Sequence, residues 1–269
     1  MRTLLLGHIT EDRFVDRCAL GGPTSFAAKV AAIAGQETRL LTSAPVEFPY
    51  WDELNALPHL AIENIESDQA TTFELSFKNG VRHLKLLSRA KPLDKTNAAL
   101  SDYVPDLVFF GPVYNEIDFG LFEFYANSCV ICGLQGFLRR TDELGFVRAS
   151  RSSFEALKNV PATLLSLSTQ DHPDAQEIAK ALSANSVVAL TDGKNGAQIF
   201  ESPSKSHFVP ALECTEVDST GAGDAFLFRL GLGLAQGEHL LNAAAAAALV
   251  ASHVVRGPGL GNLSSQTFS

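Results

Sequence analysis

A run of small residues between two aspartates, at positions 218–224, has the composition of an anion-binding turn. It reads Asp-Ser-Thr-Gly-Ala-Gly-Asp and precedes an apolar segment that favours a helix. Unpaired amides at a helix N-terminus attract phosphate, and small side chains leave those amides accessible. Asp224 would then place a carboxylate where it can accept a proton from an attacking hydroxyl. The pattern favours phosphoryl transfer to an alcohol; the alternative is a Gly-rich turn that only admits a helix close to a sheet.

The same stretch closely resembles the C-terminal signature of the ribokinase-like (PfkB) family of carbohydrate and nucleoside kinases, Asp-Thr-Thr-Gly-Ala-Gly-Asp. Ser219 stands at the first of the two Thr positions and keeps the hydroxyl. The resemblance implies that Asp224 is the catalytic base. It also implies an anion hole made by the amides of Gly221, Ala222 and Gly223.

Candidate acceptor-binding residues lie near the N-terminus. Residues 4–7 form an apolar strand, and ligands of open α/β sheets bind beyond the carboxyl ends of strands, where Asp12 follows. A solvated turn carboxylate is the alternative, and the resemblance favours substrate hydroxyls. Gly21 and Gly22 resemble the family's N-terminal Gly-Gly signature, whose amides meet the substrate. Ser25 stands near a position where the family often has Asn.

A second candidate acceptor segment follows the apolar strand expected at 129–132. Its Gln-Gly-x-x-Arg pattern, from Gln135 to Arg139, resembles a subgroup that includes inositol kinases and some archaeal nucleoside kinases. Arg139 is a candidate for holding a substrate hydroxyl or the transferring phosphate, and a salt-bridged surface arginine is the alternative. This segment leans toward a small polyol such as inositol as the acceptor.

The donor side is expected along three later segments. Where the family has Asn-x-x-Glu, which organises Mg²⁺ through water, this chain has Ser-x-x-Asp ending at Asp171. Mg²⁺ needs only one or two carboxylates, so Asp171 is a candidate, with local capping as the alternative. The segment 191–196 matches Thr-x-Gly-x-x-Gly, which lines nucleotide phosphates in the family, with a plain hairpin turn as the alternative. The implied nucleotide-binding residues are Ser168, Thr191, Gly193, Gly196, Thr220 and Asn242, the last facing the adenine or simply exposed.

The elements that must position these residues alternate between apolar strands and helices, which predicts a largely parallel sheet between helix layers. The resemblance spans Gly7 to Gly259 and implies a ribokinase-like three-layer α/β/α sandwich, with residues 1–269 as one kinase domain. Segments 71–77 and 81–87 flank an Asn-Gly turn, which predicts a hairpin. We expect it in a reduced β lid from about 9–20 and 66–90; an edge hairpin of the main sheet is the alternative.

Composition excludes several classes of protein. The 269 residues are 46% hydrophobic and 19% charged, which is ordinary for a globular chain. The net charge of −9, without any basic run, argues against nucleic acid as a partner. The longest small-apolar run, 243–251, is too short to span a bilayer, and no secretion signal begins the sequence. We expect a soluble, cytoplasmic protein. Cys129 and Cys132 point to opposite faces of a strand and are interpreted as structural thiols.

The combined expectation is an ATP-dependent, Mg²⁺-assisted kinase, a phosphotransferase with an alcohol group as acceptor. The acceptor is a hydroxyl of a sugar, an inositol-like polyol or a nucleoside, and the resemblance leaves room for a homodimer. The rival is a catalytically silent sugar- or nucleotide-binding protein that keeps the fold, suggested by the short lid and by drift at Gly133 and Asp171. The retained Asp224 argues against it. A Rossmann dehydrogenase lacks its Gly-x-Gly-x-x-Gly after the first strand.

Overall fold

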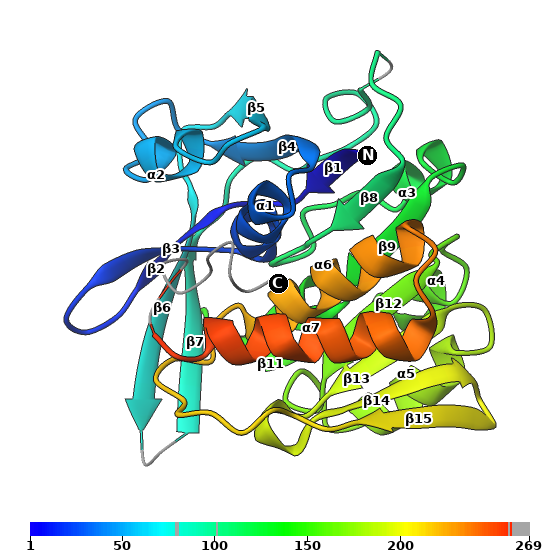
Figure 1. The fold of residues 1–269 in the computed structure, drawn as a ribbon. Helices are drawn as coiled ribbons and strands as arrows, with labels where there is room; N and C mark the ends of the chain where they lie inside the picture. The colour runs from blue at the N-terminus through cyan, green and yellow to red at the C-terminus, as the bar shows by residue number, and fades with distance from the viewer. Residues whose placement is uncertain (79–80, 101, 258, 260–269) are drawn as a thin grey trace.

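A nine-stranded sheet forms the centre of the computed structural model, which describes residues 1–78, 81–100, 102–257 and 259 (Figure 1). The order is β15-β14-β13-β12-β9-β8-β1-β4-β5, and neighbours from β13 to β5 run parallel, whereas β14 and β15 are antiparallel additions. The strands are β1 (Arg2–Leu6), β4 (Glu37–Ala44), β5 (Leu60–Glu66), β8 (Leu107–Phe110), β9 (Cys129–Gly133), β12 (Leu164–Ser168), β13 (Val187–Thr191), β14 (Ala197–Ser202) and β15 (Lys205–Val209). The expected mostly parallel sheet is confirmed.

Helices cover both faces of this sheet. One face carries α1 (Pro23–Ile33), α2 (Trp51–Asn55), α6 (Ala222–Ala235) and α7 (Leu240–Val254). The other carries α3 (Gly120–Phe124), α4 (Phe154–Leu157) and α5 (Ala175–Leu182). In Figure 1, α6 and α7 form an antiparallel pair in front of the sheet, with α1 above them. The three-layer α/β/α arrangement expected from the sequence is therefore present.

Two apolar clusters fill the spaces between the layers, which explains why the central strands are apolar on both faces. Leu5 of β1 packs with α1 and α6, while its neighbours Leu4 and Leu6 pack on the opposite face. The same alternation separates the two thiols of β9. Cys129 packs against the first cluster and Cys132 is buried in the second.

A second sheet of four strands lies apart from the central one. Its order is β3-β2-β6-β7, with β3 (Cys18–Gly21), β2 (Thr10–Arg13), β6 (Thr71–Lys78) and β7 (Val81–Ser88). The hairpin from β6 to β7 is thus no edge of the main sheet, and its Asn-Gly turn at 79–80 lies outside the described residues. One face of this sheet packs on Val113 through Phe73 and Leu75. A short antiparallel ribbon pairs β10 (Arg139–Thr141) with β11 (Val147–Ala149).

Helix α6 lies unusually close to strand β9, and glycine makes that approach feasible. A Cβ at Gly231 would overlap the side chain of Ile131, and Gly133 is in contact range of Leu227. From Gly231 to Leu227 the helix moves four residues toward its N-terminus, while its contact on β9 moves from Ile131 to Gly133. Helix α6 therefore runs antiparallel to β9, so its first turn points toward the carboxyl end of that strand.

We expect Gly231→Val to lower the free energy of unfolding by about 2 kcal/mol, because overpacking a dense core costs roughly 1–3 kcal/mol. The matched control is Gly223→Val in the same helix, where a Cβ meets nothing within 4 Å. Its change should stay within about 0.5 kcal/mol. Chemical denaturation of both variants checks the comparison. Equal losses would contradict close packing at Gly231 as the cause.

Candidate active site

The candidate residues converge at one edge of the central sheet. Strand β1 has β4 on one side and β8 on the other, so the strand order reverses there. In open α/β sheets, ligands bind at such a switch point, beyond the carboxyl ends of the strands. Strand β15 runs in the same direction as β13, because each is antiparallel to β14. The chain that leaves β15 therefore begins α6 at this same edge.

The anion-type turn at the start of α6 is accessible to solvent. Gly221 adopts a left-handed conformation with φ 79°, and its carbonyl accepts the helical bond from Ala225 at 2.9 Å. Gly223 is exposed and Asp224 is partly exposed. Asp218 Oδ1 accepts the amide of Thr220 at 2.9 Å and so shapes the entry to the turn. The turn that the sequence singles out is therefore positioned to meet a ligand.

Helix α1, which follows the Gly-Gly segment, contacts this turn through the ring of Phe26. The Phe26 ring is buried and occupies the space that a Cβ of Gly221 would need. Gly22 has φ 90°, which favours glycine. Ser25, expected to meet substrate, is fully buried, and its hydroxyl donates to the carbonyls of Gly21 at 3.1 Å and Gly22 at 2.7 Å. Its visible role is to hold the Gly-Gly turn in shape.

Asp12 is a buried carboxylate of strand β2, so the alternative of a solvated turn residue is wrong. It is 8% exposed and accepts the hydroxyl of Thr10 at 2.8 Å. Gly21 lies directly against it, because a Cβ there would overlap the carboxylate. Asp12 also lines a small cavity with Phe26 and Thr220. The structure thus brings Asp12 and the anion-type turn to one hollow, although they are 200 residues apart in sequence.

Asp12 and Phe73 share a face of the second sheet, since they are register partners in parallel strands. Arg139 lies over the Phe73 ring at 5.8 Å and donates to the carbonyl of Val113 at 3.0 Å. Arg139 is therefore packed between the second sheet and the central body. One face of the second sheet therefore carries the carboxylate of Asp12 and the ring of Phe73, with the guanidinium of Arg139 over that ring.

Gln135 belongs to a short 3₁₀ helix, η1 (Gln135–Leu138), directly after β9. Its amide donates to Asp171 Oδ1 at 3.2 Å, and Asp171 Oδ2 accepts the backbone amide of Ser168 at 2.7 Å. The hydroxyl of Ser168 accepts the amide of Gln170 at 3.2 Å. These contacts lie within the loop and are not a helix cap, because α5 begins at Ala175 with Asp174 as its N-cap. The bond to Gln135 also joins an expected acceptor residue to the expected metal residue.

Within the described residues, no group of three or more acidic, histidine or cysteine side chains could enclose a metal ion. Mg²⁺ keeps several waters and needs only one or two carboxylates when phosphates supply the rest. Asp171, with its carboxylate at the sheet edge, could supply the one protein carboxylate that such a Mg²⁺ ion needs.

Residues 191–196, expected to line nucleotide phosphates, connect the antiparallel strands β13 and β14 through η2 (Gly193–Asn195). The segment is therefore a hairpin connection, which was the alternative to a phosphate-binding turn. Gly196 has φ 96°, and a Cβ there would overlap the carbonyl of Val209. Asp192 Oδ1 accepts the hydroxyl of Thr169 at 2.6 Å. The turn at Thr191, Gly193 and Gly196 therefore lies beside the loop of Ser168 at the same sheet edge.

Asn242 is not brought to the other candidates. It is exposed in the first turn of α7, beside the end of α6, and α6 has 14 residues. At 1.5 Å per residue, that end of the pair lies about 21 Å along the axis from Gly221. The last turn of α7 is near instead, since Val255 O accepts the amide of Val217 at 2.7 Å. Asn242 is thus an exposed helix residue, the alternative that the sequence left open, and its contact with an adenine stays a prediction.

Comparison with family models finds a match in the C-terminal part of the chain. Residues 146–267, somewhat less than half of the 269 residues, match the model described as pfkB family carbohydrate kinase. This match agrees with the family resemblance and with the phosphotransferase activity that the sequence led us to expect. The comparison with curated proteins found no significant match.

Solved structures share the fold of this protein over nearly the whole chain. A pyrophosphate-dependent kinase in the ribokinase family, complexed with a pyrophosphate analog and myo-inositol, is 20% identical, with TM-score 0.82 and 96% of each chain covered. The Burkholderia thailandensis nucleoside kinase in complex with inosine is 16% identical, with TM-score 0.77 and coverage of 99% and 96%. The Arabidopsis thaliana ribokinase complexed with ribose and ATP is 15% identical, with TM-score 0.74 and the same coverage. No described helix is long and apolar enough to cross a membrane.

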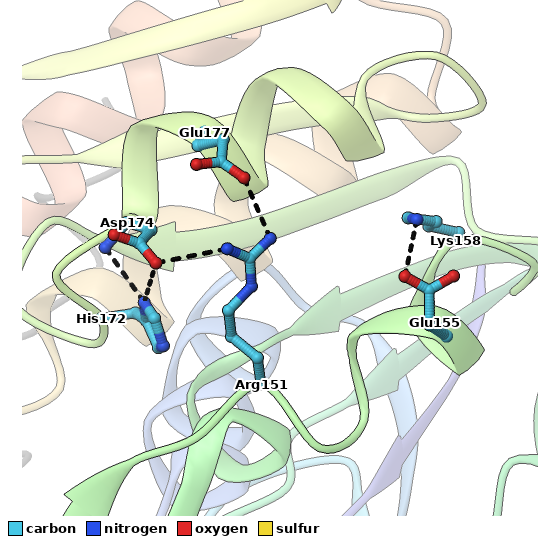
Figure 2. Close-up of polar contacts among 6 residues, drawn as sticks. All are labelled: Arg151, Glu155, Lys158, His172, Asp174 and Glu177. Atoms are coloured by element: carbon cyan, nitrogen blue, oxygen red, sulfur yellow. Dashed lines mark hydrogen bonds and ion pairs between the residues drawn. The ribbon is translucent and has the colours of Figure 1, made fainter.

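Sequence reasoning missed an ion-pair network that supports the loop after β12 (Figure 2). Arg151 bridges Asp174 at 3.2 Å and Glu177 at 3.1 Å, so it ties the segment before α4 to the start of α5. His172 Nδ1 accepts the amide of Asp174 at 3.0 Å. These contacts brace the loop that carries Asp171. Their residues are widely spaced in sequence, and no local pattern indicates that they meet.

A second missed group is the buried pair of His8 and Glu116 after β1 and β8. Glu116 is 2% exposed and accepts the amides of His8 at 3.2 Å, Val113 at 2.8 Å and Tyr114 at 2.7 Å. The His8 ring bonds to Thr71 Oγ1 at 2.7 Å and to a backbone carbonyl, that of residue 91, at 2.8 Å. His8 therefore ties the central sheet to the start of β6.

Burial lowers the pKa of His8 below its usual value, against the opposing charge of Glu116 and with a small contribution from Arg89. The neutral ring therefore stabilises the fold above the unfolded pKa of about 6.5. That stability is lost as pH falls from about 6.5 toward the lowered pKa.

We expect His8→Gln to flatten the dependence of stability on pH between 8 and 5. Denaturant unfolding at several pH values, wild type against variant, measures the difference. The wild type should lose more stability on acidification than the variant does. Parallel curves would show that His8 does not titrate as its burial implies.

Proposed function

We propose that this chain belongs to the PfkB family and is an ATP-dependent kinase that phosphorylates a hydroxyl of a sugar, polyol or nucleoside. The observation that carries the proposal is the accessible turn at the start of α6. There, a left-handed Gly221 precedes small residues and then Asp224, and Asp218 and Thr220 of the same turn line a hollow together with Asp12. We propose further that residues 1–269 act as one kinase domain in the cytoplasm, with the second sheet as a lid.

In the proposed mechanism, Asp12 and the Gly21-Gly22 backbone orient the acceptor. Asp224 takes the proton of the attacking hydroxyl, and the amides of residues 221–223 stabilise charge on the transferring phosphoryl group. Catalysis of phosphoryl transfer is largely positioning and electrostatics, so this set of groups suffices without a covalent intermediate. When bound with the donor, Mg²⁺ would offset phosphate charge, with Asp171 holding it through water.

The acceptor side favours a compact molecule with several hydroxyls. The carboxylate of Asp12, the ring of Phe73 and the guanidinium of Arg139 lie along one face of the second sheet, with Gln135 proposed to complete the acceptor site. This mixture of one apolar wall and several polar groups suits a ring that carries hydroxyls on its edge. We propose an inositol-like polyol as the first acceptor to test, ahead of ribose and inosine.

A second candidate for the donor is pyrophosphate. It is supported by the likeness of this chain to a pyrophosphate-dependent kinase in the ribokinase family complexed with a pyrophosphate analog and myo-inositol. The rival to both is a catalytically silent binding protein. A turnover screen that crosses ATP and pyrophosphate with myo-inositol, ribose and inosine separates these cases, since ligand binding without turnover in any combination would favour the rival.

We expect Asp224→Asn to abolish turnover, by at least about a thousandfold, because the amide cannot accept the hydroxyl proton. Donor binding and thermal stability should stay near wild type. The matched control is Asp52→Asn, an exposed acid in the first turn of α2, which should retain full activity. Substantial turnover by Asp224→Asn would show that the base is misassigned.

We expect Gly223→Ala to separate folding from catalysis. A Cβ at Gly223 meets open space, and Ala is favoured over Gly in helices by about 1 kcal/mol, so stability should hold or rise slightly. The added methyl group would stand where the phosphoryl group approaches, and turnover should fall about tenfold or more. Steady-state kinetics and thermal unfolding on one preparation test both parts. Unchanged kinetics would place the phosphoryl group elsewhere.

A further inference from the structure

Arg17 lies in the turn between β2 and β3 and reaches across to the anion-type turn. Its guanidinium lies 4.3 Å from the centre of the Phe14 ring, and its carbonyl accepts the amide of Phe14 at 2.8 Å. Its Nη2 is 3.3 Å from Asp218 Oδ2, although the two residues are 201 positions apart. The planar guanidinium is therefore held from two sides before any ligand binds.

Asp218 links this arginine to the proposed anion hole. While Oδ2 faces Arg17, Oδ1 accepts the amide of Thr220 at 2.9 Å. The backbone amides of Val217 and Asp218 both donate to Val255 O, at 2.7 and 3.2 Å, so the end of α7 anchors the base of the turn. The anion-type turn is thus held in place by α7, and the Arg17–Asp218 ion pair holds the turn between β2 and β3 against it.

Arg17 and Asp218 line the same hollow as Asp12 and Thr220. Asp12 sits on β2, and Arg17 follows at the far side of the turn that leaves this strand. The contact of Arg17 with Asp218 therefore fixes the position of strand β2 relative to the start of α6. The Arg17 side chain is 45% exposed, and exposed ion pairs contribute only about 0–1 kcal/mol to stability. Its importance would lie in geometry, because small misplacements of reacting groups cost large factors in rate.

We propose that Arg17 is a positioning residue of this site. Through Asp218 it holds the β2–β3 turn against the anion-type turn, so that an acceptor bound by Asp12 faces Asp224. The inference rests on the proposed kinase function.

The test uses Arg17→Met, Arg17→Lys, Asp218→Asn and the double variant Arg17→Met/Asp218→Asn in the full chain. Asp218→Asn keeps an oxygen for the Thr220 amide while it removes the charge that Arg17 meets. The control is Arg13→Met, because Arg13 also sits at the end of β2 but pairs with Glu11 at 2.6 Å, a residue whose register places it on the opposite face from Asp12.

Two readouts are needed. The first is kinetics with whichever of myo-inositol, ribose or inosine the wild type phosphorylates, with donor and acceptor varied separately. The second is hydrogen–deuterium exchange over residues 10–21 and 217–225, which needs no substrate. Thermal unfolding verifies that each variant is folded.

We expect Arg17→Met to lower kcat/KM for the acceptor about tenfold and to leave KM for the donor within twofold. Arg17→Lys should recover part of the loss. The double variant should be no worse than the poorer single variant, since both remove one coupled contact. Exchange should speed up in residues 10–21 for Arg17→Met, and Arg13→Met should match the wild type in every measurement.

Wild-type acceptor kinetics and exchange in Arg17→Met would overturn the inference. So would additive losses in the double variant, or an equal effect of Arg13→Met. These failures are distinct from failure of the proposed function, which would appear as ligand binding without turnover in every combination of donor and acceptor. Without turnover of any acceptor, unchanged exchange in Arg17→Met would overturn the inference by itself.

Discussion

The contact between Phe26 and Gly221 joins the two glycine-containing turns on which the site depends. The first turn of α1 and the first turn of α6 are almost 200 residues apart, yet the Phe26 ring fills the space beside Gly221 that any larger residue would occupy. Because Gly221 also has φ 79°, this position is restricted twice, by sterics and by backbone conformation. That single close packing sets the first turn of α1 against the first turn of α6.

Carboxylates around the site serve the backbone as well as the proposed chemistry. Glu116, Asp171 and Asp218 each accept backbone amides from the irregular segments at the carboxyl edge of the sheet. Loops in such places leave N–H groups outside any ladder, and buried groups of this kind must find partners. An acidic protein can thus still offer phosphate a favourable site, since the attraction comes from oriented amides rather than net charge.

Much of this arrangement could be predicted from the sequence. The apolar strands, the parallel sheet and the Gly-rich start of α6 are local patterns, and the structure contains all three. The role of Ser25 could not be predicted, because its hydroxyl turns back to the carbonyls of its own turn and a sequence position does not reveal that direction. The position of Asn242 could not be predicted for a related reason, since the antiparallel pairing of α6 and α7 places it at the end of the pair that is far from Gly221.

The sequence by itself determined the chemistry on offer: a small-residue turn, a carboxylate after it, and strands apolar enough to be buried on both faces. These depend on residue type and short spacing. Tertiary structure decided which distant groups meet. It placed Asp12 on a strand of the second sheet, set Arg17 against Asp218, and joined Gln135 to Asp171. Such contacts arise from how layers pack and in which direction helices return, and no local pattern encodes either.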